Sequence, residues 1–211
     1  YKMKAVIFDL DGVLIDSERF YMEKNIEFCY LHGYPMQLEE MMTVVGTQVI
    51  ETYKLLYEKT EPDMDFHEFV QYYDKWFDDL EVDYGTIMNP HGKETLEEFK
   101  KRGMKIGLAS SSPMWGILQA LDQCGITSYF DSVISGDEFA RSKPDPEIYL
   151  TSAKKLGCPC EECLVVEDSA MGIEAGVRAN MKVVALKEPF HPDQYQADYH
   201  VEDLSEILNY I

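Results

Sequence analysis

The sequence predicts an α/β fold, a doubly wound, Rossmann-like parallel sheet with an all-helical insertion after its first strand. From Asn89-Pro90 onward, short apolar segments alternate with amphipathic ones. The apolar segments are hydrophobic throughout, which is typical of parallel strands that helices cover on both faces. Residues 18–81, in contrast, show almost no strand-type alternation and are rich in Glu, Met, Tyr and Leu, which favours helices.

Each expected element follows from local signals. Val6–Phe8 is a short apolar run and forms the first strand. Three breaks divide the insertion into four helices: His32-Gly33-Tyr34-Pro35, Gly46 and Glu61-Pro62. Asp16 and Ser17 can cap the first of these helices, and Ser112 is the expected N-cap of a later one that begins at Pro113. The later helices are expected over residues 93–102, 113–124, 146–156 and 170–179, and the strands over 105–109, 132–135, 163–166 and 182–186.

These elements imply two parts of the chain. Residues 1–16 and 84–211 are expected to form the α/β core, and residues 17–83 a helical cap. An insertion directly after the first strand stands at the carboxyl ends of the strands, where ligands bind in doubly wound sheets. The insertion is therefore expected to cover a binding site at that edge.

The acidic composition excludes two classes of partner. The chain carries 39 Asp and Glu residues against 19 Lys and Arg, a formal net charge of −20. Nucleic-acid binders and proteins that dock on anionic membranes normally show the opposite balance, so we expect neither partner. No apolar run approaches the roughly 20 residues of a membrane span, and the N-terminal stretch lacks the shape of a signal peptide. Five irregularly spaced cysteines do not make a disulfide framework, which favours a cytoplasmic location; we also expect a monomer.

Polar residues stand where several expected strands end. Four such stretches occur: Asp9-Leu10-Asp11-Gly12, Ser110-Ser111-Ser112, Ser142-Lys143-Pro144-Asp145 and Glu167-Asp168-Ser169. The carboxyl ends of parallel strands meet at one edge of the sheet, so these stretches are expected to converge there.

The acidic pairs predict a metal site. The simplest interpretation of Asp9 and Asp11 by themselves is two solvent-facing acids or a helix cap. The same interpretation applies to Glu167 and Asp168 by themselves. Together they place several carboxylates at adjacent strand ends, where mutual repulsion favours a bound divalent cation. Carboxylate oxygens suit Mg²⁺, which binds through a few carboxylates, substrate oxygens and water.

The serines and the lysine are candidates for holding an anion. Ser110 and Ser111 follow a strand and precede a helix, where hydroxyl and backbone N–H groups can bind phosphate. The plainer interpretation is capping of the next helix. Lys143 lies in a turn, where a solvent-facing amine is the usual outcome, but among acids its ammonium can neutralise phosphate oxygens.

Four ordered stretches also carry a family resemblance. They read FDLDGVLIDS, LASSS, SKPDPEIY and VVEDSAMGIEA. Together they resemble the four motifs of the haloacid dehalogenase superfamily. Their exact residues are similar to those of the branch that contains β-phosphoglucomutase and sugar phosphatases with small helical caps. The resemblance spans nearly the whole chain. It implies a Mg²⁺-dependent enzyme of phosphoryl transfer, either a phosphatase that hydrolyses a small phosphomonoester such as a sugar phosphate or a mutase of the β-phosphoglucomutase type.

The resemblance also implies residue roles. Asp9 would attack phosphorus and form an aspartyl-phosphate, and Asp11 would act first as general acid and then as general base. Mg²⁺ would lie between Asp9, the backbone carbonyl of Asp11, and Asp168, with Glu167 nearby or binding through water. The phosphate oxygens would be held by Ser110, Ser111 and Lys143. Dehalogenase members have a single acid in the first motif, so Asp11 indicates phosphoryl transfer.

The cap decides between hydrolase and mutase. The resemblance implies that a mutase holds a second phosphate through two cap residues, an Arg in a Gly-x-x-Arg stretch and a His. In place of the first, this chain has Gly46-Thr47-Gln48-Val49, which lacks the Arg. In place of the His, it has Tyr21. Without a clamp for a second phosphate, water is the favoured acceptor. The residues expected to contact substrate are Tyr21, Gly46, Thr47 and Gln48, with ordinary cap surface as the alternative.

Two other interpretations remain open. A non-catalytic receiver-like module also uses an acid cluster, Mg²⁺ and a phosphate-accepting Asp, but it lacks a helical cap and an acid placed like Asp11. The stretch Cys158-Pro-Cys160-Glu-Glu-Cys163 contains a CxxC, which raises zinc or redox chemistry. No second Cys or His pair at suitable spacing accompanies it, so buried structural cysteines are favoured.

Overall fold

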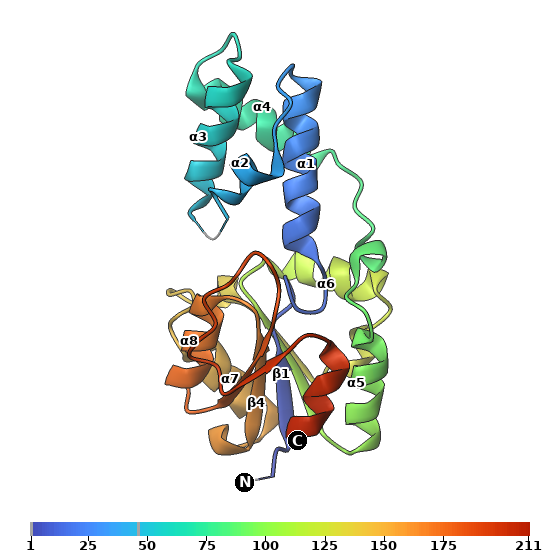
Figure 1. Ribbon diagram of the computed structural model, residues 1–211. Helices are drawn as coiled ribbons and strands as arrows, with labels where there is room; N and C mark the ends of the chain where they lie inside the picture. The colour runs from blue at the N-terminus through green and yellow to red at the C-terminus, as the bar shows by residue number, and fades with distance from the viewer. Residues whose placement is uncertain (1, 46) are drawn as a thin grey trace. The chain divides into compact units, whose positions relative to one another are not determined.

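The chain divides into two compact units. The structure, a computed structural model, describes residues 2–45 and 47–211. The core unit joins the N-terminal segment through Asp16 to Asp83–Ile211, and the helical unit comprises Ser17–Val82. The helical unit is therefore inserted after the first strand of the core, as the colouring of Figure 1 makes visible.

The core unit is built on one parallel sheet of six strands, in the order β3-β2-β1-β4-β5-β6. The strands are β1 (Ala5–Phe8), β2 (Lys105–Ser110), β3 (Ser132–Ser135), β4 (Cys163–Glu167), β5 (Lys182–Leu186) and β6 (Tyr199–Val201). The first strand lies at the centre, between β2 and β4, and the order reverses there. The predicted doubly wound α/β fold is thus confirmed, with its switch point beside β1.

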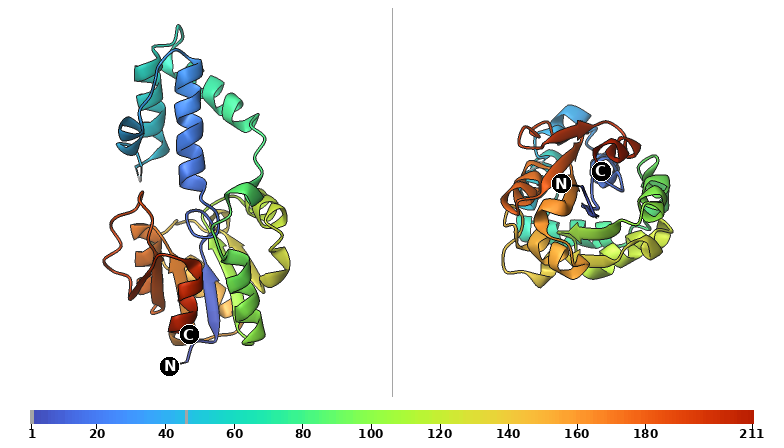
Figure 2. Two further views of the ribbon diagram at one scale, coloured as in Figure 1. Left: turned by 45° about the vertical axis from the view of Figure 1, so that its right-hand side comes forward. Right: turned by 90° about the horizontal axis from the view of Figure 1, so that it is seen from below.

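Helices cover both faces of this sheet (Figure 2). The helices are α5 (Gly92–Lys101), α6 (Met114–Gln123), α7 (Glu147–Leu156) and α8 (Ala170–Arg178), with a 3-10 helix at Leu204–Tyr210. Val6 and Phe8 of β1 pack with α5, α6 and the 3-10 helix, while Ala5 and Ile7 pack with α7 and α8. Alternate residues of the strand thus enter opposite cores, which explains why the strand is apolar throughout.

The structure corrects one predicted cap and contains elements that were not predicted, among them short 3-10 helices at Tyr84–Ile87, Thr127–Tyr129, Gly136–Glu138 and Cys160–Glu162. Ser112 is not an N-cap, because Pro113 occupies that position of α6 and the Ser112 hydroxyl instead donates to Asp11. The edge strand β6 and the 3-10 helix after it have no counterpart among the predicted elements. A three-residue strand between polar residues gives too short a pattern to be recognised.

The helical unit contains α1 (Ser17–Leu31), α2 (Leu38–Met42), α3 (Val49–Thr60) and α4 (Phe66–Asp78). Its interior is aromatic, with the Phe28 ring in T-shaped edge contact with Phe69 and Tyr73. Asp65 caps α4 by accepting from the Glu68 backbone N–H, and Glu68 reciprocates. The unit therefore has its own small core.

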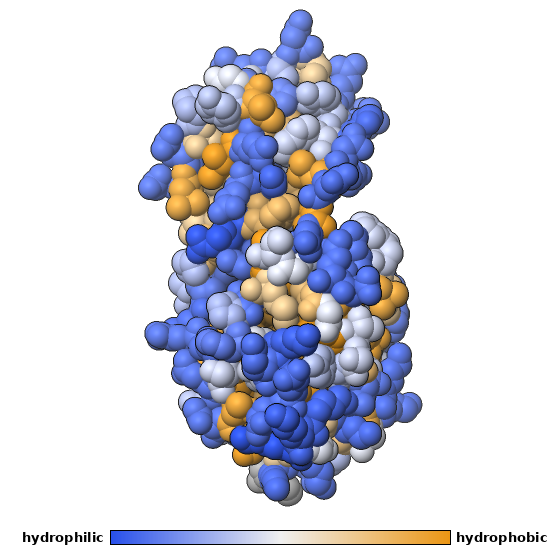
Figure 3. Space-filling model, turned by 90° about the vertical axis from the view of Figure 1, so that its right-hand side faces the viewer, coloured by the Kyte–Doolittle hydropathy of each residue, from blue (hydrophilic) through white to orange (hydrophobic). Residues whose placement is uncertain are grey.

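Polar residues dominate the face drawn in Figure 3, which agrees with the strongly acidic composition, and smaller hydrophobic patches interrupt them. Within residues 2–45 and 47–211, we find no helix with the length and hydrophobicity that a bilayer crossing requires.

Candidate active site

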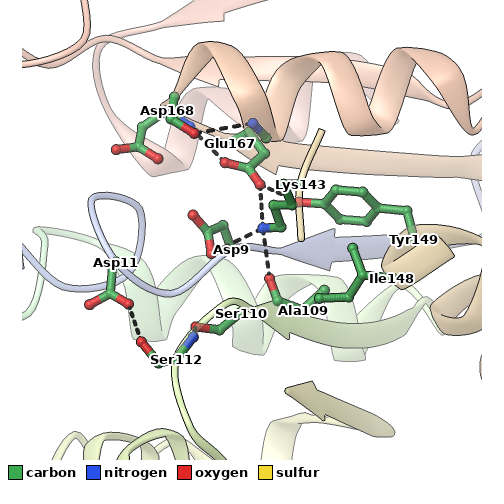
Figure 4. A network of polar contacts seen from close by, with 12 residues as sticks. Asp9, Asp11, Ala109, Ser110, Ser112, Lys143, Ile148, Tyr149, Glu167 and Asp168 are labelled. Carbon is green, nitrogen blue, oxygen red and sulfur yellow. Dashed lines mark hydrogen bonds and ion pairs between the residues drawn. The ribbon is translucent and has the colours of Figure 1, made fainter. Parts of the chain in front are cut away.

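Three adjacent strands of the core unit deliver acidic or hydroxyl side chains to one edge of the sheet (Figure 4). Asp9 follows β1, and its backbone N–H donates to the Val166 carbonyl of β4 at 3.0 Å. Glu167 is the last residue of β4 and Asp168 follows it, while Ser110 ends β2. The parallel register brings these strand ends side by side, as the sequence predicts.

Lys143 joins these strand ends through its ammonium group. The Nζ atom lies 2.6 Å from Glu167 Oε1 and 3.4 Å from Asp9 Oδ1, and donates to the Ala109 carbonyl at 3.1 Å. Its side chain is only 7% exposed, and burial alone would lower its pKa, but the charges of Asp9 and Glu167 raise the pKa above its ordinary value. Lys143 is therefore a buried, permanently charged group rather than the solvent-facing amine of an ordinary turn.

Glu167 is held on both of its oxygens. Its side chain is 0% exposed. Oε1 accepts from Lys143 and from the Tyr149 hydroxyl of α7, and Oε2 accepts from the Asp168 backbone N–H at 3.3 Å. The ring of Tyr149 also lies 5.0 Å from Lys143 Nζ, a cation–π contact. These contacts fix the carboxylate with Oε1 directed at Lys143.

Tyr149 and Gly172 are site residues that the sequence reasoning missed. Burial, followed by the charges of Glu167 and Asp9, raises the pKa of Tyr149, so its hydroxyl remains a donor. A Cβ on Gly172 of α8 would lie 2.1 Å from Glu167 Cδ, so only glycine leaves room for this carboxylate. The available signal was position, because Tyr149 ends the SKPDPEIY stretch and Gly172 lies in VVEDSAMGIEA.

Three carboxylates form a group that fits a cation. The oxygens of Asp9, Glu167 and Asp168 all lie within 4.8 Å of one another. Burial raises the pKa of Asp9 well above its ordinary value, and the charge of Glu167 adds to this, while Lys143 opposes it. A donor set made only of oxygens, with unfavourable mutual repulsion, fits a hard divalent ion such as Mg²⁺.

Asp11 has surroundings of its own. Its Oδ2 accepts from the Ser112 hydroxyl at 2.8 Å, on the β2 side of the edge. Its carboxylate is not part of the group formed by Asp9, Glu167 and Asp168. The two acids of the first motif thus belong to different local networks. The expectation that the Asp11 carbonyl holds a cation stays a prediction.

Gly12 makes the turn after Asp11 compatible with Asp168. Its φ of +78° is unfavourable for other residues, and an added Cβ would lie 2.0 Å from Asp168 Oδ2. The absence of a side chain therefore makes room for the carboxylate of a neighbouring strand.

The serines lie at the expected edge. Ser110 is fully buried, and its hydroxyl accepts from the Ser112 backbone N–H at 3.1 Å, which tightens the turn after β2. Ser111 is exposed at the same turn. Their role in holding phosphate stays a prediction, as does that of Lys143.

The predicted substrate-contacting residues belong to the helical unit. The ring of Tyr21 contacts Phe20 and Phe77, so it contributes to the aromatic packing of that unit. Thr47 donates to the Val44 carbonyl at 2.6 Å, and Gln48 is the N-cap residue of α3. Gly46 lies outside the described residues. Substrate contact by these four positions stays a prediction.

The cysteines of the CxxC stretch are free thiols. The Cys158 and Cys163 thiols donate to the Leu156 and Pro159 carbonyls at 3.7 and 3.4 Å. Burial raises the pKa of Cys163 to about 12, and of Cys158 above its ordinary value, so the reactive thiolate is disfavoured. These observations agree with structural cysteines.

We expect Lys143→Met to lower the free energy of unfolding by about 3 kcal/mol, because it leaves buried carboxylates without their ammonium. Adding Glu167→Gln should restore much of that loss, since one uncompensated charge is then removed. The matched control is Lys100→Met, which breaks the half-exposed pair with Asp131 at 2.8 Å and should cost less than about 1 kcal/mol. Urea unfolding measures all three. Equal losses for the Lys143 and Lys100 variants would contradict the buried network.

Comparison with known proteins agrees with this geometry. The chain matches the family described as "Haloacid dehalogenase-like hydrolase" over residues 6–186. It is 32% identical over 182 residues to "Phosphorylated carbohydrates phosphatase" of Thermotoga maritima, covering 85% of this chain and 83% of that protein. It is 27% identical over 221 residues to "Pyrophosphatase PpaX" of Oceanobacillus iheyensis, covering 99% and 97%.

A solved structure is similar over the same length. This structure, described as a "putative beta-phosphoglucomutase" from Thermotoga maritima, is 30% identical with a TM-score of 0.84, covering 99% of this chain and 98% of its own. The predicted resemblance is confirmed, and the match to a hydrolase family argues against the receiver-like alternative. The chain belongs to the haloacid dehalogenase-like hydrolase family.

Proposed function

We propose that this protein is a Mg²⁺-dependent phosphatase that hydrolyses a small phosphomonoester, such as a sugar phosphate, through an aspartyl-phosphate. The observation that carries the proposal is the separation of Asp9 from Asp11. Asp9 lies close to Lys143, Glu167 and Asp168. Asp11 lies outside that group and accepts a hydrogen bond from the Ser112 hydroxyl. Phosphoryl transfer through an enzyme carboxylate needs one acid to attack phosphorus and a second to transfer the proton, and two separate networks are compatible with this division.

The proposed steps use these side chains directly. An Asp9 oxygen attacks phosphorus, and the bond from phosphorus to the ester oxygen breaks as Asp11 gives that oxygen a proton. Water then attacks the aspartyl-phosphate while Asp11 takes its proton, which releases phosphate and regenerates both acids. Lys143, 3.4 Å from Asp9 Oδ1, offers positive charge to the phosphoryl oxygens at the point of attack.

The acid group at the sheet edge would hold the cation. Asp9 and Asp168 are the proposed ligands, with the Asp11 carbonyl, and Glu167 contributes nearby because Lys143 and Tyr149 already engage its Oε1. When bound, Mg²⁺ supplies charge that screens the nucleophile from the anionic substrate and stabilises the transferring group. Gly12 and Gly172 leave room for the carboxylates of Asp168 and Glu167.

The relatives guide the choice of substrate. One carries the name of a phosphatase of phosphorylated carbohydrates and another that of a pyrophosphatase. We therefore propose sugar phosphates as the first substrate class, with pyrophosphate and nucleotides as the comparison compounds of a screen. Cytoplasmic location and a monomeric state stay predictions.

We expect the purified chain to release phosphate from p-nitrophenyl phosphate over many turnovers with Mg²⁺ present. Removal of metal with EDTA should lower the rate by roughly 100-fold or more, and added Mg²⁺ should restore it, because Asp9 then loses the cation that screens its charge. Phosphate release measured before and after chelation checks both points. Stoichiometric labelling of the protein without turnover would contradict the proposed hydrolysis.

A mutase of the β-phosphoglucomutase type is the second candidate, and similarity to the structure that carries that name favours it. The stretch Gly46-Thr47-Gln48-Val49 argues against it, because it lacks an Arg to hold a second phosphate. Glucose 1-phosphate with a trace of the bisphosphate distinguishes them: glucose 6-phosphate supports the mutase, and free phosphate alone supports the hydrolase.

A further inference from the structure

The segment between β5 and β6, residues 187–198, contains a buried amide that the proposed mechanism does not use. Gln194 is only 6% exposed although it lies in an irregular loop. Buried side-chain amides are uncommon, and they are normally retained where their hydrogen bonds are satisfied. The contacts of this residue therefore indicate what the loop does.

The Gln194 side chain ties two strand ends together. Its Nε2 donates to the Asp168 carbonyl at 2.7 Å and to the Leu186 carbonyl at 2.8 Å. Both partners are acceptors, so both hydrogens of the NH₂ group are used and the orientation of the amide is fixed. Asp168 directly follows β4 and Leu186 ends β5. One side chain thus fixes the backbone of Asp168 relative to the neighbouring strand.

The loop is itself anchored around this residue. The Gln194 carbonyl lies 2.9 Å from His200 Nε2 of β6, and the Gln194 backbone N–H donates to the Pro192 carbonyl at 3.2 Å. Further along, the Asp198 carboxylate accepts from the Val183 backbone N–H at 2.9 Å. These hydrogen bonds hold the backbone around Gln194 in one conformation, so the position of its side chain is well defined.

The same loop also reaches the carboxylate of Asp168. His191 Nε2 lies 3.7 Å from Asp168 Oδ2, and its side chain is largely buried. On another side, Gly12 leaves the space that this carboxylate occupies. The loop thus contacts Asp168 twice, at its carbonyl through Gln194 and at its carboxylate through His191.

We propose that Gln194 is a positioning residue for the cation site: by fixing the Asp168 backbone it sets the direction of the Asp168 carboxylate toward Asp9 and Glu167. The inference rests on the proposed function, because Asp168 is a cation ligand only under that proposal. Removal of a residue that hydrogen-bonds to a metal ligand typically weakens metal affinity by 10- to 100-fold. A residue with a purely structural role would instead lower the stability of the protein and leave the affinity of the folded protein for metal unchanged.

The test uses Mn²⁺ as the probe and the full chain. Free Mn²⁺ is followed by electron paramagnetic resonance during titration, and the variant is Gln194→Met, which keeps the length of the side chain and removes both N–H donors. We expect the dissociation constant for Mn²⁺ to rise roughly tenfold. The matched control is Gln123→Met, which removes an acceptor for the Tyr84 backbone N–H at the far end of α6 and should change the constant less than twofold.

The outcomes separate the inference from the proposed function. An unchanged Mn²⁺ affinity in folded Gln194→Met overturns the inference even if the enzyme is an active phosphatase. A tenfold weaker affinity supports it, and it does so whether or not p-nitrophenyl phosphate is hydrolysed, because metal binding is measured without substrate. If Gln194→Met fails to fold, Gln194→Asn is titrated in the same way, because its shorter side chain cannot donate to both the Asp168 and the Leu186 carbonyls. An unchanged affinity of folded Gln194→Asn overturns the inference.

Discussion

Asp9→Asn is expected to abolish turnover, lowering kcat for p-nitrophenyl phosphate by roughly 10³-fold or more, since loss of a nucleophile removes the covalent step. An amide of the same size cannot attack phosphorus. The fold should persist, because the hydrogen bond from residue 9 to the Val166 carbonyl uses only the backbone. Burial and Glu167 also raise the pKa of Asp9, so the protein loses a charge that its surroundings disfavour.

The Asp9 prediction is checked by phosphate release at saturating Mg²⁺, with thermal unfolding recorded alongside. Asp122→Asn is the control, because Asp122 is an exposed acid on α6 and its loss should leave kcat within about twofold. Substantial turnover by folded Asp9→Asn would show that another group attacks phosphorus.

Gly12→Ala is expected to lower kcat/KM by roughly 100-fold, the effect of misplacing a reacting group by about 1 Å. The new Cβ would stand 2.0 Å from Asp168 Oδ2, so either the carboxylate or the turn after Asp11 must move. The positive φ of +78° adds a backbone cost of about 1–2 kcal/mol in stability. Kinetics over a range of Mg²⁺ concentrations, together with urea unfolding, measure both effects.

Gly103→Ala separates the two contributions to the Gly12 result. Gly103 has a similar φ of +74°, but an added Cβ meets nothing within 4 Å. This control should therefore lose a similar amount of stability and keep its activity within about twofold. If both variants lose activity equally, general destabilisation and not displacement of Asp168 accounts for the effect.

The sequence predicts the sheet because its signals are local and repeated. Five strands are short apolar runs between helices, and their polar ends identify Asp9, Ser110, Glu167 and Asp168 without knowledge of tertiary contacts. The parallel register then determines that these ends meet. Lys143 is predicted as an anion-binding group from its place among acids, but its burial between two carboxylates becomes visible only in the structure.

What the sequence does not predict depends on contacts between distant positions. Gln194 is 26 residues from Asp168 in the sequence. It lies in a loop whose composition is that of an ordinary polar surface loop. Tyr149 resembles an ordinary apolar residue of an amphipathic helix until its hydroxyl is found on Glu167. Ser112 satisfied the pattern of an N-cap, but a side-chain bond to Asp11 replaced that role. In each case a tertiary hydrogen bond determines the position of a side chain whose local sequence pattern is commonplace.

The shared position of Lys143 has a consequence for charge balance. With all four groups ionised, Asp9, Glu167 and Asp168 contribute three negative charges and Lys143 one positive charge, which leaves two negative charges on these four side chains. A divalent ion neutralises that remainder, whereas a monovalent ion leaves the site repelling any phosphate. The arrangement therefore favours an order of arrival in which the cation binds first and the anionic substrate follows it.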